Sequence, residues 1–140
     1  MTIDAELITR KLVLITSDLE SLRTIAARGL DQYLQSRFDQ AVVERHLERI
    51  VGRMIDINYH VITESGLPPP ADYHASFTRL VELRLLDPEF AQRIARAAGL
   101  RNRLVHEYEE IDSRKVFEGL EAALRDIPLY LSRVNAFVEP

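Results

Sequence analysis

The chain has 140 residues, of which 46% are hydrophobic and 29% are charged, and it contains no cysteine. A chain of this length forms one domain with a sizeable core, and the lack of cysteine excludes disulfides, thiolate metal sites and cysteine nucleophiles. The net charge of −4 argues against a general nucleic-acid binder, which usually carries a basic face.

The N-terminal residues, MTIDAELITRK, include an early acid and no uninterrupted apolar run, so they do not predict a signal peptide. No stretch approaches the ~20 apolar residues that are needed to cross a bilayer. We therefore expect a cytoplasmic protein that has no contact with a membrane.

Two long amphipathic helices are predicted in the first half of the chain. The first spans about 4–28 and is followed by Gly29, and the second spans about 39–65 and is followed by Gly66, with a short link at 30–37. Their apolar residues alternate in steps of four and three: Ile8, Leu12, Ile15, Leu19, Leu22 and Ala26, then Val43, Leu47, Ile50, Met54, Ile57 and Val61. Helices of matched length and pattern predict a long antiparallel hairpin.

The next segment, LPPP at 67–70, cannot be helix interior and is interpreted as a rigid linker. Asp72 is a helix cap, and it should begin a shorter helix over 73–85 with its apolar residues turned inward: Phe77, Leu80 and Val81.

Asp87 and Pro88 form a strong start signal for a fourth helix, which we expect to continue without a break through the string RNRLVHEY. Asp112 caps the last helix, and Pro128 should kink or split it. No strand pattern competes. The sequence therefore predicts an all-α bundle of about five helices, with residues 1–140 forming a single domain.

Residues 91–106 contain four arginines and no acidic residue: Arg93, Arg96, Arg101 and Arg103. The planar guanidinium group binds phosphate through two parallel hydrogen bonds, which makes Arg96 and Arg103 candidates for contacts with RNA phosphates. Arginine-rich composition is also found in GC-rich genomes and in proteins from warm habitats, so composition alone leaves both interpretations open.

The string RNRLVHEYEEID at 101–112 adds a histidine and a tyrosine to this basic segment. On a regular helix Arg101 lies on the buried face, where an unpaired guanidinium is costly and requires a polar cleft, an acid partner or a second subunit. His106, five positions on, is turned well away from Arg101. Either the helix loosens before His106, or the two side chains meet through another chain.

Metal-free cleavage of RNA needs a base for the 2′-hydroxyl, an acid for the leaving oxygen and a cation near the phosphate. Histidine suits both proton transfers near neutral pH. One chain offers a single histidine in this stretch, whereas a two-fold dimer offers His106 twice, beside two copies of Arg101. This chemistry requires no metal and no cofactor.

The spacing of Arg101, His106 and Tyr108 resembles the R-x4-H-x-Y signature of HEPN-domain proteins, specifically the HepT toxin ribonucleases. The resemblance covers essentially the whole chain, including the helix lengths, the segment MIDINYHVI at 54–62 and the proline-rich break. It implies a HEPN-like helical bundle that forms a homodimer, in which two motifs face each other across a cleft.

By this resemblance Arg101 and His106 are the catalytic pair of a metal-independent endoribonuclease, and Asn102 helps to position the site. The implied partner is an MNT-type nucleotidyltransferase antitoxin, in a type VII-like toxin–antitoxin pair, which transfers AMP to the motif tyrosine, Tyr108. AMP on Tyr108 would add bulk and negative charge beside the phosphate-binding arginines.

Asp56 is a candidate acid partner for Arg101 or Arg103. His60 follows Asp56 by four residues, and this pair allows either a metal site or a structural hydrogen bond, of which the hydrogen bond is the simpler. The chain has no nucleotidyltransferase motif of its own. The alternative function is a non-catalytic helical module that binds a nucleotidyltransferase.

Overall fold

The structure is a computed structural model that describes residues 2–139, and of Tyr108 it describes the backbone only. It is all-α and contains no strand within this range. The α-helices are α1 (Ala5–Ala27), α2 (Leu30–Gln35), α3 (Arg37–Glu64), α4 (Tyr73–Thr78), α5 (Pro88–Ile94), α6 (Arg96–His106) and α7 (Ser113–Val138). Two short 3-10 helices are η1 (Arg79–Val81) and η2 (Tyr108–Glu110). The predicted helical bundle is confirmed.

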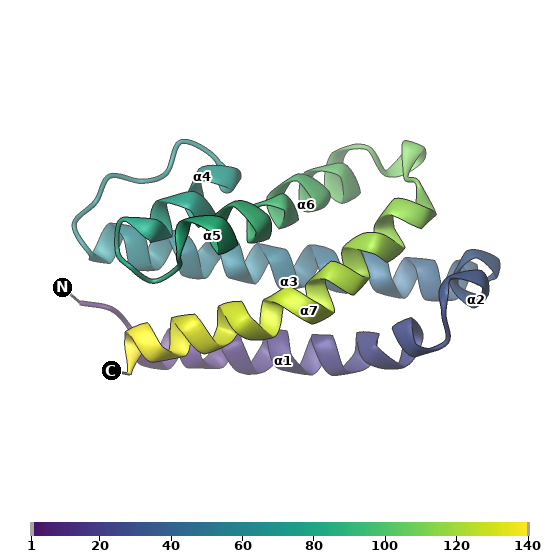
Figure 1. Cartoon of the computed structure of the whole chain (residues 1–140), viewed down its shortest axis with the longest axis horizontal. Coiled ribbons are helices and arrows are strands. Elements are labelled where there is room, and N and C mark those ends of the chain that lie inside the picture. The colour runs from purple at the N-terminus through teal and green to yellow at the C-terminus, as the bar shows by residue number, and fades with distance from the viewer. Residues whose placement is uncertain (1, 140) are drawn as a thin grey trace.

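The long hairpin is formed by α1 and α3, which run antiparallel and lie side by side (Figure 1). All six predicted core residues of α3 are buried, and four of the six in α1 are: Ile8, Ile15, Leu19 and Leu22. Figure 1 shows α7 returning along α1, while α4, α5 and α6 lie along α3 on its other side. One cluster of apolar side chains joins all of these helices.

Three aspartates begin helices in the way that the sequence predicts. The carboxylate of Asp72 accepts a hydrogen bond from the backbone N–H of Ala75 at 2.7 Å, and Asp87 accepts one from Phe90 at 2.9 Å. Asp112 caps α7 in the same manner. Each cap satisfies backbone donors that the first turn of a helix leaves without a partner.

The proline-rich linker is held against the helix that follows it. Pro70 is buried, and the guanidinium Nη1 of Arg79 donates a hydrogen bond to the carbonyl oxygen of Pro68 at 3.0 Å. The cap at Asp72 then fixes Tyr73 as the first residue of α4.

The predicted helix over 73–85 is too long. α4 ends at Thr78, and after η1 the chain turns through Arg84, whose φ of 59° is left-handed. The backbone N–H of Leu85 closes this turn on the carbonyl of Leu80 at 3.1 Å. The turn reverses the chain so that α5 can pack against α4.

The fourth predicted helix is broken at Ala95 into α5 and α6. The N–H of Ala98 bonds to the carbonyl of Ala95, three residues back, instead of four. This tighter turn shifts the helical phase, so that Ala98 is buried whereas Ala97 is partly exposed.

Pro128 does not split α7, which runs without interruption from Ser113 to Val138. Proline removes one donor from the helical ladder and leaves the carbonyl four residues earlier, at Leu124, without its usual partner. Leu124 is partly exposed, so water can satisfy that carbonyl. No helix of the described chain is long and apolar enough to span a bilayer.

Candidate active site

The arginine–histidine motif lies at the C-terminal end of α6. The helix is α-helical up to its last residue, His106, and the N–H of Glu107 still bonds to the carbonyl of Arg103 at 2.9 Å. Of the two alternatives that the spacing left open, loosening of the helix before His106 is therefore not what the structure shows. On a regular helix, Arg101 and His106 lie about 140° apart around the axis, so one chain does not aim both at one point.

Arg101 lies over α3 and against α4. Its guanidinium carbon is 5.1 Å from the ring centre of Tyr73, and a Cβ atom placed on Gly52 would lie 3.9 Å from its Nε. Nε is buried and has no hydrogen-bond partner among the described residues. An unsatisfied buried donor costs about 1–3 kcal/mol, so this side chain is held by its ring contact rather than by hydrogen bonding at Nε.

A cavity of about 590 Å³ opens beside Arg101, between α3, α4 and α6. We call it the Arg101 pocket, and its lining residues are Arg49, Gly52, Arg53, Ile55, Asp56, Tyr59, Tyr73 and Arg101. Three of these side chains are guanidiniums and one is a carboxylate. The side chains that line the pocket therefore carry an excess of positive charge, although the net charge of the chain is −4.

Two of the pocket arginines are fixed by a buried acid on α1. The carboxylate of Asp18 is 2.7 Å from Nη1 of Arg53 and 3.7 Å from Nη2 of Arg49. Nε2 of His46 is 3.9 Å from Oδ1 of Asp18, the oxygen that faces Arg49. Asp18 is only 7% exposed. These arginines were missed in the sequence analysis, although a cation every four residues on the polar face of α3 was visible: Arg45, Arg49 and Arg53.

Two tyrosine rings form the wall below Arg101. Tyr59 and Tyr73 meet edge to face with ring centres 6.3 Å apart. Burial raises the pKa of Tyr59, and the neighbouring Tyr73 and Asp72 raise it further. Tyr59 thus stays neutral and keeps its hydroxyl proton in the pocket. No local sequence signal pointed to Tyr73, because its role depends on packing between α4 and α6.

Asp56 lines the Arg101 pocket, and within one chain it forms no ion pair with Arg101 or Arg103. Its carboxylate is 64% exposed and pairs instead with Nζ of Lys11 on α1, at 3.4 Å. His60, one turn later on α3, accepts a hydrogen bond from the backbone N–H of Asp4 at 3.0 Å. The structural interpretation of His60 is confirmed.

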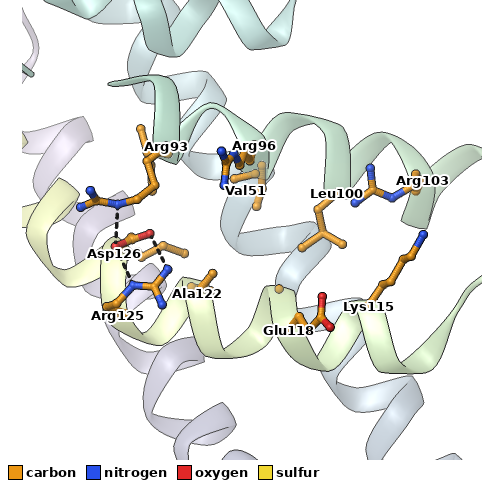
Figure 2. Close-up of a pocket in the computed structure, with 15 residues that line it drawn as sticks. Val51, Arg93, Arg96, Leu100, Arg103, Lys115, Glu118, Ala122, Arg125 and Asp126 are labelled. Carbon is orange, nitrogen blue, oxygen red and sulfur yellow. Dashed lines mark hydrogen bonds and ion pairs between the residues drawn. The ribbon is translucent and has the colours of Figure 1, made fainter. Parts of the chain in front are cut away.

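The remaining predicted residues are spread over α6 and its end. His106 and Asn102 are exposed, and the side chain of neither forms a hydrogen bond or ion pair with a described residue. Arg96 and Arg103 do not join Arg101, because they line a separate cavity between α6 and α7 (Figure 2). Tyr108 begins η2, and its side chain lies outside the described part of the structure.

Comparison with known proteins decides the family. The model of the family described as ribonuclease HepT-like matches residues 15–134. The chain belongs to the ribonuclease HepT-like family. The resemblance inferred from the R-x4-H-x-Y spacing is thereby confirmed.

Two relatives of this HepT-like chain are named as nucleases. The tRNA nuclease HepT of Aphanizomenon flos-aquae is 37% identical over 136 residues, which cover 97% of this chain and 92% of that protein. The mRNA nuclease HepT of Shewanella oneidensis is 25% identical over 131 residues, covering 94% of this chain and 98% of the relative.

Solved structures share the fold over nearly the whole length. The tri-AMPylated Shewanella oneidensis HEPN toxin in complex with its MNT antitoxin matches with a TM-score of 0.85 and 25% identity, covering 97% of this chain and 99% of that one. A toxin–antitoxin complex with AMP-PNP matches with a TM-score of 0.82 and 24% identity, covering 96% and 99%. The HEPN-like fold that the motif implied is therefore confirmed.

Proposed function

We propose that this protein is the toxin of a toxin–antitoxin pair and that it cleaves RNA as a metal-independent endoribonuclease. Family membership and the two relatives named as HepT nucleases support ribonuclease activity. The observation that carries the site assignment is the placement of Arg101, stacked on Tyr73 in a pocket with two further guanidiniums. Such a pocket suits a phosphodiester, which carries one negative charge and offers several acceptor oxygens.

The chemistry assigns His106 to proton transfer and Arg101 to the phosphate. His106 is exposed on the last turn of α6, where a neutral imidazole can take the 2′-hydroxyl proton and an imidazolium can protonate the leaving oxygen. Arg101 would stabilise charge that develops on the phosphate in the transition state. Asn102, the residue after Arg101 on α6, would help to orient the substrate, and Asp56, which lines the Arg101 pocket, would orient its surrounding cations.

The angle between Arg101 and His106 on α6 supports a homodimeric site. Because the helix stays regular, the histidine of one chain does not share a face with its own arginine. A two-fold arrangement that brings two α6 ends together would supply two imidazoles and two guanidiniums around one phosphodiester.

We propose further that an MNT-type nucleotidyltransferase is the antitoxin and that it transfers AMP to Tyr108. The solved Shewanella oneidensis relative, a HEPN toxin in complex with an MNT antitoxin, is tri-AMPylated. Tyr108 follows the end of α6 by two residues. Phosphate groups placed there would compete with RNA for the nearby arginines and would obstruct the histidine.

The test is cleavage of RNA by the purified protein in EDTA, compared with two histidine variants. His106→Ala should lower the rate by about 100-fold or more, which is the usual scale for loss of a general acid or base. His74→Ala, at another exposed histidine on α4, is the matched control and should retain the wild-type rate.

The same assay separates this function from the non-catalytic alternative. Intact mass must first show that Tyr108 carries no AMP, since modified protein would be inactive for another reason. Unmodified protein that leaves RNA uncut with and without divalent metal would identify a helical module that only binds its nucleotidyltransferase. Cleavage that requires metal would refute the metal-independent mechanism.

A further inference from the structure

A second cavity, on the other side of α6, has a chemistry of its own. Its volume is about 330 Å³, and it lies between α5 and α6 on one side and α7 on the other (Figure 2). We call it the α6–α7 pocket. It shares no lining residue with the Arg101 pocket. A ligand held here would therefore not occupy the site that we assign to the reaction.

The walls of the α6–α7 pocket are largely apolar. They are formed by small and aliphatic residues of α3, α5, α6 and α7: Val51, Ile94, Ala97, Leu100, Gly119, Ala122, Ala123 and Ile127. Figure 2 shows Leu100 projecting from α6 toward α7 between the charged ends of the cavity. A Cβ on Gly119 would lie 2.7 Å from Leu100 Cδ2, so only glycine lets Leu100 adopt this position. Apolar walls of this kind can bury the hydrophobic faces of a ligand.

The rim carries five cations and two carboxylates. At one end, the 4%-exposed carboxylate of Asp126 pairs with Nε of Arg93 at 3.3 Å and with Nε of Arg125 at 3.2 Å. Both of these arginines are therefore already engaged. The other acid, Glu118, has no ion pair with any described residue.

The remaining three cations are Arg96, Arg103 and Lys115, and none of them forms an ion pair within the described chain. Arg96 and Arg103 are seven residues apart, which places them on one face of α6, and Lys115 faces Arg103 from α7 (Figure 2). Acidic residues line an adjoining hollow beyond Arg103 and Lys115, but no ion pair joins them to these cations. The end of the pocket that Arg103 and Lys115 form thus presents positive charge that no ion pair within the described chain neutralises, and Arg96 lies on the other side of Leu100 (Figure 2).

We propose that the α6–α7 pocket binds a nucleoside phosphate, with the base against the apolar wall and the phosphate on Arg103 and Lys115. Apolar walls alone would suit a neutral ligand, and cations alone would suit inorganic phosphate. A nucleotide uses both, and its size fits a cavity of this volume. The bound nucleoside phosphate is either a free nucleotide or one unit of the RNA. If it is a unit of RNA, the inference rests on the proposed function.

The experiment measures binding rather than cleavage, on full-length His106→Ala protein that intact mass shows to be free of covalent AMP. The probes are AMP, a single-stranded RNA hexanucleotide and inorganic phosphate, each titrated by calorimetry. Lys115→Gln and Arg103→Gln should each weaken AMP or RNA binding about tenfold, because each removes one charge-assisted contact. Arg114→Gln changes the neighbouring exposed cation of α7, outside this pocket, and should leave binding unchanged.

The outcomes distinguish a free nucleotide from a unit of RNA. They also distinguish failure of this proposal from failure of the proposed function. AMP binding that depends on Lys115 identifies the free nucleotide, and it would stand even if the protein cleaved no RNA. Binding of the hexanucleotide alone, with the same dependence, identifies a unit of RNA. Failure of both probes to bind, equal loss in Lys115→Gln and Arg114→Gln, or phosphate binding as tight as AMP would overturn the proposal. Ala122→Phe, which fills the apolar part of the pocket, should weaken the binding of AMP without altering the charges of the rim.

Discussion

Two tyrosines of the core, Tyr33 and Tyr130, are both fully buried but differ in the contacts of their hydroxyl groups. The Tyr130 hydroxyl is 2.6 Å from Oδ1 of Asn58 and 3.2 Å from the carbonyl of Met54, whereas the Tyr33 hydroxyl has no partner among the described residues. Burial raises the pKa of each phenol above its usual value, so both stay neutral. The bonded hydroxyl also holds Asn58, which donates to Ser76 on α4 at 3.2 Å.

This difference predicts opposite outcomes for the same chemical change. Tyr130→Phe should lower the free energy of unfolding by about 1–3 kcal/mol, because it leaves the buried Asn58 oxygen without its donor. Tyr33→Phe removes a hydroxyl that no described group satisfies and should be neutral or stabilising. Urea denaturation of both variants is the measurement, and an equal loss of stability in the two would contradict the assignment.

For single residues, the motif could be identified from the sequence, but the side chains that contact it in the folded chain could not. Arg101 and His106 could be singled out because their spacing lies within one short string. Tyr73 and Arg53 could not be connected with Arg101, because those contacts depend on how α3 and α4 pack against α6. The pairing of Asp56 with Lys11 could not be predicted for the same reason, since Lys11 reaches it from a third helix.

For the helices, the residues at which they begin could be predicted better than the residues at which they are interrupted. A cap such as Asp72 or Asp87 acts on a backbone N–H three residues away, so its signal is local. The break at Ala95 has no local signal, because alanine is the residue that most favours a helix. It arises from packing, since Ala91, Ala95 and Ala98 are all buried at the junction of α5 and α6.

The contact between α6 and α7 can be tested through Gly119. Replacing glycine by alanine within an exposed helix usually stabilises it by about 1 kcal/mol, but here the added Cβ would lie 2.7 Å from Leu100. We expect Gly119→Ala to be destabilising in the wild type and stabilising in a Leu100→Ala background. Thermal unfolding of the double-mutant cycle measures the coupling.

Gly99→Ala supplies the control for that cycle, because its Cβ would meet only Nη1 of Arg103 at an ordinary 3.6 Å. It should stabilise α6 regardless of the residue at position 100. If Gly99→Ala and Gly119→Ala coupled equally to Leu100→Ala, the 2.7 Å distance between a Cβ at position 119 and Leu100 would not explain the effect on stability.

For the molecule as a whole, the proposed dimer makes a quantitative prediction about mixtures. If two copies of His106 serve one site, a dimer of one wild-type and one His106→Ala chain is inactive. Co-refolding wild type with about a nine-fold excess of the variant should then lower the activity per wild-type chain to about one tenth, because few wild-type chains pair with each other.

The measurement is the RNA cleavage rate of the mixtures, and a matched mixture with His74→Ala should show no loss. A rate per wild-type chain that does not change with the proportion of His106→Ala would mean that each chain carries an independent site. In that case the two-fold arrangement would be wrong even if His106 is essential.

The proline-rich linker ends where Arg101, the arginine that we propose for catalysis, is supported. Its stiff backbone leads through the Asp72 cap to Tyr73, and the Tyr73 ring lies under the guanidinium of Arg101. Through Tyr73, the linker therefore positions the guanidinium that we propose to meet the phosphodiester. If Arg101 acts as we propose, the accuracy of RNA cleavage depends in part on a segment that lies outside the motif.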